Sequence, residues 1–186
     1  MDQPQFRPST DAASQSGVNS TASSRRLYAL FYLGSEALAV EAAAIQRFSL
    51  MARLSTPGGL PSILKGFLNF AGQLIPIINL HRILDLPAPV ENLYTQILIL
   101  RSQEGPPFGW IVDRVAQVLA LRRSDLTPVP EGACFKEYTT DVFTLHDRQV
   151  PILAPERILL QKERLSVDEF RSMEEARLRQ LELSAP

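Results

Sequence analysis

Short apolar runs, separated by glycine, proline or polar turn residues, recur about every ten residues over most of this chain. Runs this short, rich in aromatic and β-branched residues, are typical of strands rather than helices. The predicted strands are 27–33, 38–40, 47–54, 66–70, 74–80, 94–100, 108–112, 115–121, 139–145 and 149–153. Together with 14 prolines in 186 residues, they predict a mainly β fold built as barrels or as a sandwich.

Two of these strands share a motif with a central proline. Residues 75–84 (IPIINLHRIL) and 150–159 (VPILAPERIL) both run apolar-Pro-apolar-apolar and end in Arg-Ile-Leu. A weaker similarity joins 45–48 to 115–118, so the pattern indicates two related β-units, with chance similarity of apolar strands as the alternative. Because proline cannot donate to a β-ladder, Pro76 and Pro151 are expected at edges or bulges.

The two ends of the chain differ from this β region. Residues 1–24 are mostly Ser, Thr, Ala, Gln and Asn, so we expect a disordered polar tail. Ser166 and Glu169 have the spacing of a capping box and predict a helix over 166–183. The apolar residues expected on one face of it are Val167, Phe170, Met173, Leu178 and Leu181. This helix either packs on its own domain or binds a partner, with Phe170 and Met173 as the anchors in both cases.

Composition restricts the class of protein. A chain of this length with 45% hydrophobic residues can form one core or two small adjoining cores. The formal charge of -1 disfavours binding to nucleic acid or to an anionic membrane. A single cysteine, Cys134, excludes an intrachain disulfide and a Cys-rich zinc site. No signal peptide or membrane-spanning run is found, so we expect a cytoplasmic protein without direct membrane insertion.

Few residues are candidates for catalysis or for cofactor binding. His81 and His146 are the two histidines, most simply explained as a helix-start residue and a turn residue. The one enzymatic alternative is a thiol site of Cys134 and His146, for which the sequence indicates no third, orienting group. Gly58-Gly59 lacks the context of a phosphate-binding loop. We therefore expect no enzyme, no cofactor and no metal, but a β-rich binding module.

Residues 64–80, LKGFLNFAGQLIPIINL, resemble the signature of the CheW family of chemotaxis coupling proteins. That signature runs apolar-Lys-Gly-apolar-apolar-Asn-Leu-Arg-Gly and then apolar-apolar-Pro-apolar-apolar-Asp-Leu. Other stretches resemble the family in the same order, namely 30–40, 45–48, 110–121 and 150–160. The resemblance covers roughly residues 27–161.

The resemblance implies a mainly β fold of two packed, five-stranded SH3-like β-barrels, expected over 27–84 and 92–161, followed by the C-terminal helix. It further implies a non-enzymatic scaffold in a chemotaxis or twitching-motility type pathway. Such an adaptor couples the regulatory domain of a CheA-like histidine kinase to the cytoplasmic tip of a chemoreceptor. The alternative is a CheW-fold adaptor for a partner outside the receptor array, recognised through the C-terminal helix.

The resemblance also indicates which residues border the receptor-facing groove. They are Arg47, Phe48, Asn69, Ala71 and Gly72. Arg47 replaces the glutamate of the family's Val-x-Glu-Ile segment, and Ala71 replaces the arginine of Asn-Leu-Arg-Gly. Because surface charges govern partner choice, these departures are expected to change the receptor partner rather than the fold. Gly66 and Gly72 are expected to permit close turns.

Overall fold

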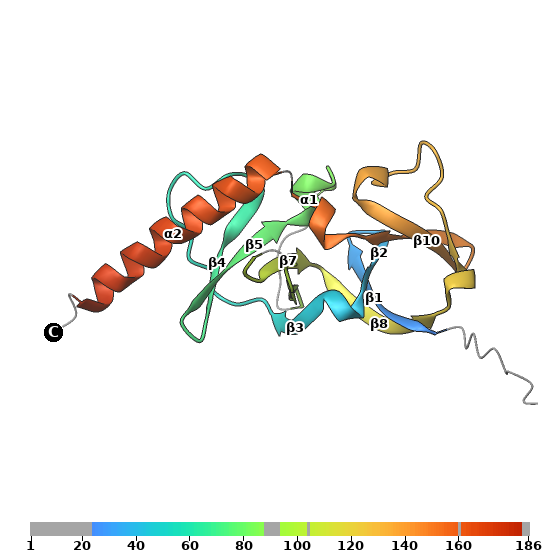
Figure 1. The fold of residues 1–186 in the computed structure, drawn as a ribbon, viewed down its shortest axis with the longest axis horizontal. Helices are drawn as coiled ribbons and strands as arrows, with labels where there is room; N and C mark the ends of the chain where they lie inside the picture. The colour runs from blue at the N-terminus through green and yellow to red at the C-terminus, as the bar shows by residue number, and fades with distance from the viewer. Residues whose placement is uncertain (1–23, 88–93, 104, 160, 184–186) are drawn as a thin grey trace, which may run out of the picture.

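The computed structural model describes residues 24–87, 94–103, 105–159 and 161–183. It contains two β-units side by side, and one long helix lies along the unit that contains β4 and β5 (Figure 1). Most of the predicted tail, residues 1–23, lies outside the described residues. The mainly β architecture with a C-terminal helix is confirmed.

All ten predicted strands are present, with ends that shift by a few residues. They are β1 (Arg26–Leu33), β2 (Glu36–Glu41), β3 (Ile45–Leu50), β4 (Leu64–Phe70), β5 (Gln73–Asn79), β6 (Gln96–Leu100), β7 (Phe108–Val112), β8 (Arg114–Leu121), β10 (Thr139–Leu145) and β11 (Arg148–Leu153). The two-residue strand β9 (Leu126–Thr127) was too short to be predicted. The helices are α1 (Leu80–Ile83), α2 (Gln161–Leu183) and the short 3-10 turns η1 (Ala42–Ala44), η2 (Arg123–Asp125), η3 (Lys136–Tyr138) and η4 (Pro155–Arg157).

The strands form two sheets with the same plan. Sheet A has the order β8-β1-β2-β11-β10-β9, and sheet B has the order β3-β6-β7-β5-β4. In each, two antiparallel pairs are followed by one parallel pair and another antiparallel pair. β11 and β5 therefore hold equivalent places, as do β8 and β3. These are the strands that the sequence repeat relates, so the repeat reflects the architecture.

The strands do not divide between the sheets at the expected boundary between residues 84 and 92. β1 and β2 belong to sheet A together with β8 to β11, whereas β3 to β7 form sheet B. The chain crosses to sheet B after β2 and returns after β7. Each repeat unit therefore contributes strands to both sheets, and neither sheet is complete without the other half of the chain.

The buried side chains form three layers. Ala29, Phe31 and Leu33 of β1 join a core that is shared between the sheets, whereas Tyr28 and Leu30 fill the interior of sheet A. β6 alternates in the same way between the shared core and the interior of sheet B. Trp110 is fully buried in the shared core. A strand that is buried on both faces has apolar residues at successive positions, which explains the continuous apolar runs in the sequence.

The two prolines lie in interior strands and not at sheet edges, but a register shift in the pairing with the neighbouring antiparallel strand follows one residue after each of them, as the expectation of bulges allows. β5 lies between β7 and β4, and β11 lies between β2 and β10. In both strands the parallel pairing begins one residue after the proline, at Ile77 and at Ile152. Pro76 and Pro151 thus lie just before the parallel ladders begin.

Gly66 does not lie in a turn. It follows a register shift inside β4, where its φ is +149° and an added Cβ would lie 2.6 Å from the Ser55 carbonyl oxygen. Gly72 does occupy a turn, between β4 and β5, with φ +83°. Glycine is therefore required at Gly66 by a close backbone approach.

Helix α2 begins at Gln161, five residues before its predicted start, so Ser166 and Glu169 lie inside it and form no capping box. Gln, Lys, Glu, Arg and Leu at 161–165 are good helix formers, which favours this earlier start. Val167 is buried, and Phe170 and Leu178 are half-buried against the shared core. Met173 is 62% exposed and lies off this face. Glu174 takes its place because seven residues complete about two helical turns from Val167.

Candidate functional site

A groove lies between the two sheets where the edge strand β3 approaches β8. Phe48 and Leu50 of β3 line it, together with Gln96 and Val115, in a hollow of about 320 Å³. The Gln96 Oε1 atom accepts a hydrogen bond of 2.8 Å from the Val115 backbone N–H, which joins the two sheets at this point. Phe48 is 50% exposed and Leu50 is 64% exposed. The groove therefore presents large apolar side chains to solvent.

Arg47 serves a different part of the surface. Its guanidinium carbon lies 4.4 Å from the centre of the Phe70 ring, a cation–π contact. Phe70 ends β4, which is the opposite edge of sheet B from β3. Sheet B therefore curls until its two edges approach one another, and Arg47 joins the β4–β5 hairpin. The Phe48 side chain leaves β3 on the other side because successive side chains alternate along a strand.

The tip of that hairpin is a two-residue turn of Ala71 and Gly72, both with left-handed backbone (φ 50° and 83°). The Asn69 Oδ1 atom accepts a hydrogen bond of 3.1 Å from the Gly72 backbone N–H, so Asn69 stabilises the turn. Ala71 is exposed and has no polar side chain. The structure thus brings Arg47 close to this hairpin, while Phe48 belongs to the groove between the sheets.

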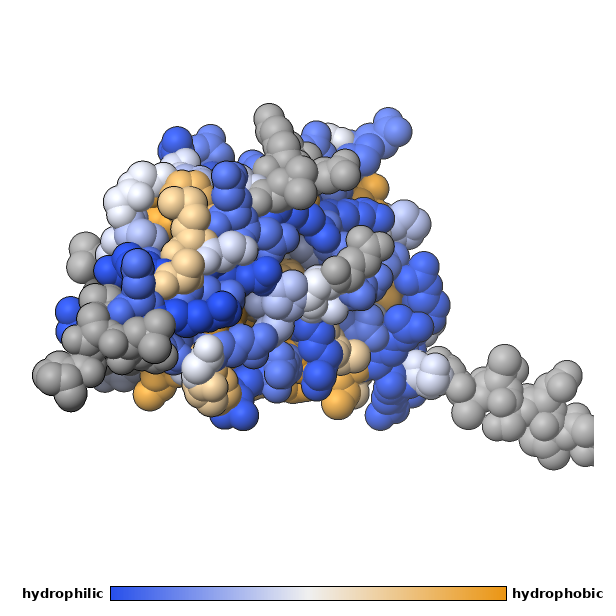
Figure 2. Space-filling model, turned by 60° about the vertical axis from the view of Figure 1, so that its left-hand side comes forward, coloured by the Kyte–Doolittle hydropathy of each residue, from blue (hydrophilic) through white to orange (hydrophobic). Residues whose placement is uncertain are grey.

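Three exposed residues near β3 and β8 were missed by sequence reasoning. Leu50 lies two residues after Phe48 on the same strand, which is the signal that could have found it. Val118 of β8 is 52% exposed and corresponds to Phe48 in the repeat. Arg114 of β8 stacks over the Tyr32 ring at 4.0 Å, a contact that the sequence does not indicate. Figure 2 shows separate apolar spots along the lower edge of the molecule, the edge where Figure 1 places β3 and β8.

Helix α2 is attached to sheet B through a buried carboxylate. Glu174 is 2% exposed and accepts hydrogen bonds from the Ser55 hydroxyl and from the Arg177 Nε (2.8 Å) and Nη2 (2.7 Å) atoms. The hydrogen bonds from Arg177 hold the pKa of Glu174 below its ordinary value, although burial acts in the opposite direction. Leu178 lines a hollow that Asn69 also lines, so α2 reaches the side of the β4–β5 hairpin.

The two expected anchors of this helix have different surroundings. Phe170 packs against the shared core, so it stabilises the domain. Met173 faces solvent and is available for a partner. The prediction that the helix packs on its own domain is correct for the Phe170 face, and the partner-binding role stays a prediction for Met173.

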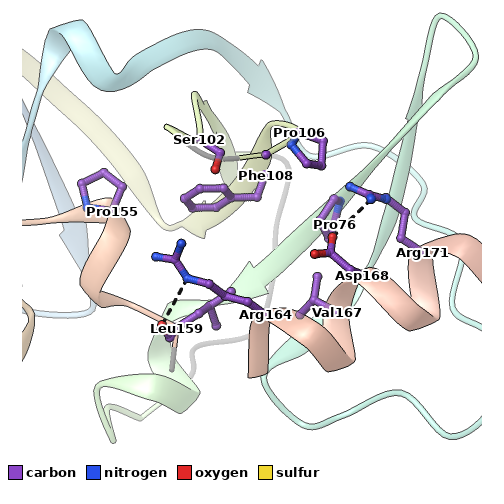
Figure 3. A pocket seen from close by; sticks show the side chains of 11 residues that line it. Pro76, Ser102, Pro106, Phe108, Pro155, Leu159, Arg164, Val167, Asp168 and Arg171 are labelled. Atoms are coloured by element: carbon purple, nitrogen blue, oxygen red, sulfur yellow. Dashed lines mark hydrogen bonds and ion pairs between the residues drawn. The ribbon is translucent and has the colours of Figure 1, made fainter. Parts of the chain in front are cut away.

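A separate cavity of about 160 Å³ lies between the first turns of α2, Pro76 and the loop before β7 (Figure 3). Its walls are largely apolar, and Arg164 and Arg171 reach into its rim. The Arg164 Nε atom donates to the Leu159 carbonyl at 3.4 Å, and Arg171 pairs with Asp168 at 3.2 Å. The cavity contains none of the predicted site residues.

The structure does not assemble the alternative thiol site. Cys134 is exposed in the loop before η3, and His146 lies in the β10–β11 turn with φ 48°. Among the described residues, no hydrogen bond joins them, and no group of three His, Cys, Asp or Glu side chains could hold a metal ion. His81 is buried, with its Nε2 atom 3.5 Å from the Asp113 Oδ1 atom. Over the same residues, no helix has the length and apolar character needed to span a bilayer.

The stretches that resemble the CheW family all lie within the region that matches known proteins. The model of the CheW-like domain family matches residues 27–163. The chemotaxis protein CheW of Klebsiella aerogenes is 27% identical over 143 residues, which are 76% of this chain and 86% of that protein. The CheW of Helicobacter pylori is 30% identical over 100 residues, or 53% of this chain and 60% of that protein.

A solved structure has a similar fold. The scaffolding protein TtCheW from Thermoanaerobacter tengcongensis matches with a TM-score of 0.66 and 18% sequence identity, over 70% of this chain and 85% of that chain. At this identity the match shows the fold, which is the expected pair of SH3-like barrels. The family match ends at residue 163, so nearly all of α2 lies beyond it.

Proposed function

This chain belongs to the CheW-like domain family, and from that premise we propose that it couples a CheA-like histidine kinase to a chemoreceptor. Members of this family are non-enzymatic scaffolds in chemotaxis, which agrees with the expectation of an adaptor. In the proposed role, the regulatory domain of the kinase and the cytoplasmic tip of the receptor are the two partners. The pathway is of the chemotaxis or twitching-motility type, and the protein acts in the cytoplasm, associated with the receptor array through its partners.

The observation that carries this proposal is the apolar groove between β3 and β8. The exposed Phe48 and Leu50 of the edge strand β3 line this groove together with Val115 of the edge strand β8. Exposed apolar surface of this kind is typical of interaction sites. A groove between two strands can hold the apolar face of a helix, as the tip of a receptor hairpin would present it.

The proposal is tested by calorimetry with the full chain. The titrants are the regulatory domain of a CheA-like kinase and a receptor-tip fragment from the same organism. Phe48→Glu is expected to abolish binding of the receptor tip and to leave the far-UV circular dichroism unchanged, because Phe48 is half-exposed. Leu27→Glu, at another exposed apolar position that is not a predicted anchor, is the matched control and should bind like the wild type. Failure of both titrants to bind the wild-type protein would reject the proposed function.

The second candidate is an adaptor that recognises a different partner through α2. The exposed Met173 favours it, as does the position of α2 outside the family match. Deleting residues 166–186 tests this candidate. Loss of partner binding with an unchanged thermal melt would support a recognition helix, whereas a lowered melting temperature would indicate a structural role. We expect the lowered melting temperature because Val167 and Phe170 pack against the shared core.

A further inference from the structure

The cavity beneath the first turns of α2 contains a buried donor that lacks an acceptor. The Arg171 side chain is 18% exposed, and its Nη2 and Nε atoms lie 3.2 Å from Asp168 and 3.8 Å from Glu175. Within the part of the chain that the structure describes, the buried Arg171 Nη1 atom has no hydrogen-bond partner. Burial of a guanidinium donor without an acceptor is unfavourable. The Nη1 atom therefore indicates an acceptor that comes from outside the chain.

A second guanidinium lines the same cavity. Arg164 precedes Arg171 by seven residues, or about two turns, so both side chains leave α2 on the same side. Figure 3 shows the Arg171 guanidinium beside Pro76. The Arg164 guanidinium closes another end of the cavity, where it donates to the carbonyl oxygens of Leu159 and Glu156. These acceptors are neutral, so they leave the positive charge of Arg164 in place.

The acidic side chains near the cavity do not balance these two charges. Of the described residues that line it, Asp168 alone is acidic, and it pairs with Arg171. Glu175 approaches Arg171 from outside the lining. The Glu156 carboxylate accepts a hydrogen bond of 3.1 Å from Gln103 and lines a different hollow. The cavity therefore has an excess of positive charge, which favours an anionic ligand.

The remaining walls determine the rest of the ligand. Apolar side chains from β5, the loop before β7 and α2 surround the cavity, namely Pro76, Pro106, Phe108, Leu159 and Val167. Its volume is about 160 Å³. An apolar cavity of about 150 Å³ accepts one benzene ring. The planar fork of a guanidinium matches a carboxylate in geometry and in charge.

We propose that this cavity binds a small aromatic carboxylate. The ring packs between Phe108 and Val167, and the carboxylate accepts a hydrogen bond from the Arg171 Nη1 atom. The ligand contacts α2, β5 and the loop before β7 together, so it strengthens the attachment of α2 to sheet B. This proposal goes beyond the adaptor function and does not depend on it, because the groove residues Phe48 and Leu50 do not line the cavity.

The test titrates benzoate into the full chain and follows binding by calorimetry and by NMR chemical shifts. We expect a Kd of about 1 mM or below, the range that so small a ligand can reach. Benzyl alcohol retains the ring without the charge, and acetate retains the charge without the ring. Each is expected to bind at least about tenfold more weakly than benzoate. Saturating benzoate should also raise the melting temperature, because it binds the folded state.

A variant of α2 assigns the binding to its residue. Arg171→Gln removes the positive charge beside the ring site and is expected to weaken benzoate binding at least about tenfold. Arg179→Gln is the matched control, since Arg179 lies on the same helix, 3.8 Å from the same Glu175, and its side chain is 76% exposed. It should bind benzoate like the wild type. Far-UV circular dichroism verifies that both variants fold, and the ligand series on the wild type decides the proposal without any variant.

Three results would overturn the proposal. They are no saturable binding of benzoate up to about 10 mM, equal affinity for benzoate and benzyl alcohol, and wild-type affinity in a folded Arg171→Gln protein. Acetate that bound as tightly as benzoate would reveal a site for small anions only and would reject the aromatic ligand. The titrations with the receptor tip and the kinase domain are separate experiments, so either conclusion can fail without the other.

Discussion

Sheets A and B are built to one plan, but they differ at the same structural point. Each has a register shift near the start of the outer hairpin strand, before Gly66 in β4 and before Asp141 in β10. The next residues, Phe67 and Val142, pair with Ser55 and with Thr127 respectively. The short strand β9 in sheet A is therefore the counterpart of the isolated bridge at Ser55 in sheet B.

What lies against this shared point is different in the two sheets. In sheet B the Ser55 carbonyl approaches Gly66 closely, and the Ser55 hydroxyl bonds to Glu174 of α2. In sheet A the Asp141 side chain pairs with Arg123 at 3.0 Å. The pairing of the strands is thus the same in both sheets, whereas the side chains at this point differ. In sheet B they attach helix α2.

The largest loss of stability is expected from Gly66→Ala, a substitution at the point where the two sheets differ. The new Cβ would meet the Ser55 backbone in a conformation that favours glycine, so we expect a loss of about 2–4 kcal/mol in the free energy of unfolding. Chemical denaturation followed by circular dichroism measures it. Gly132→Ala is the control: φ there is +79° but an added Cβ meets nothing within 4 Å, so about 1 kcal/mol is expected. Equal losses in the two variants would show that the approach of Ser55 is unimportant.

The strands were predictable because their side chains are buried on both faces or alternate clearly. The repeat was also visible, since β5 and β11 occupy equivalent positions with the same proline motif. The exchange of strands between the sheets was not, because the sequence of each hairpin is compatible with either sheet. The partner of Ser55 was hidden for a similar reason: Glu174 is 119 residues away and carries a charge that normally indicates an exposed position.

The candidate site was predictable only in part. Motif resemblance indicated Arg47 and Phe48, but it could not indicate that they serve opposite sides of β3. That separation depends on the curling of sheet B, which places Phe70 of one edge against Arg47 of the other. Contacts between the edges of a sheet leave no periodic signal in a sequence.

The second prediction tests how helix α2 is attached to sheet B. Glu174→Gln is expected to lose about 1–2 kcal/mol of the free energy of unfolding at pH 7, because charge-assisted hydrogen bonds from Ser55 and Arg177 are weakened. Denaturation of both proteins between pH 7 and pH 3 measures the dependence on ionisation. Since the folded pKa of Glu174 is depressed, its contribution is present above the ordinary value of 4.5 and is lost as pH falls through the folded pKa. The two proteins should therefore converge in acid.

Glu175→Gln is the control for this prediction. Glu175 is the next residue of α2, with a side chain that is 36% exposed and 3.8 Å from both Arg171 and Arg179. Exposed pairs of this kind contribute about 0.5 kcal/mol or less. A stability difference between Glu174→Gln and wild type that stayed constant with pH would contradict the role of the ionised carboxylate.

The smallest effect concerns the two faces of α2. Met173→Ala is expected to change the free energy of unfolding by no more than about 0.5 kcal/mol, because its side chain is 62% exposed. Phe170→Ala, three residues away on the docked face, should lose about 2 kcal/mol or more, since it removes packing from the shared core. Thermal and chemical denaturation of the two variants measures this contrast. If Met173→Ala were as destabilising as Phe170→Ala, Met173 would be part of the packing and unavailable to a partner. If Met173→Ala instead weakened partner binding and left the stability unchanged, the exposed face of α2 would be a second interaction surface in addition to the groove. Both surfaces would then involve sheet B, whose edge strand β3 lines the groove.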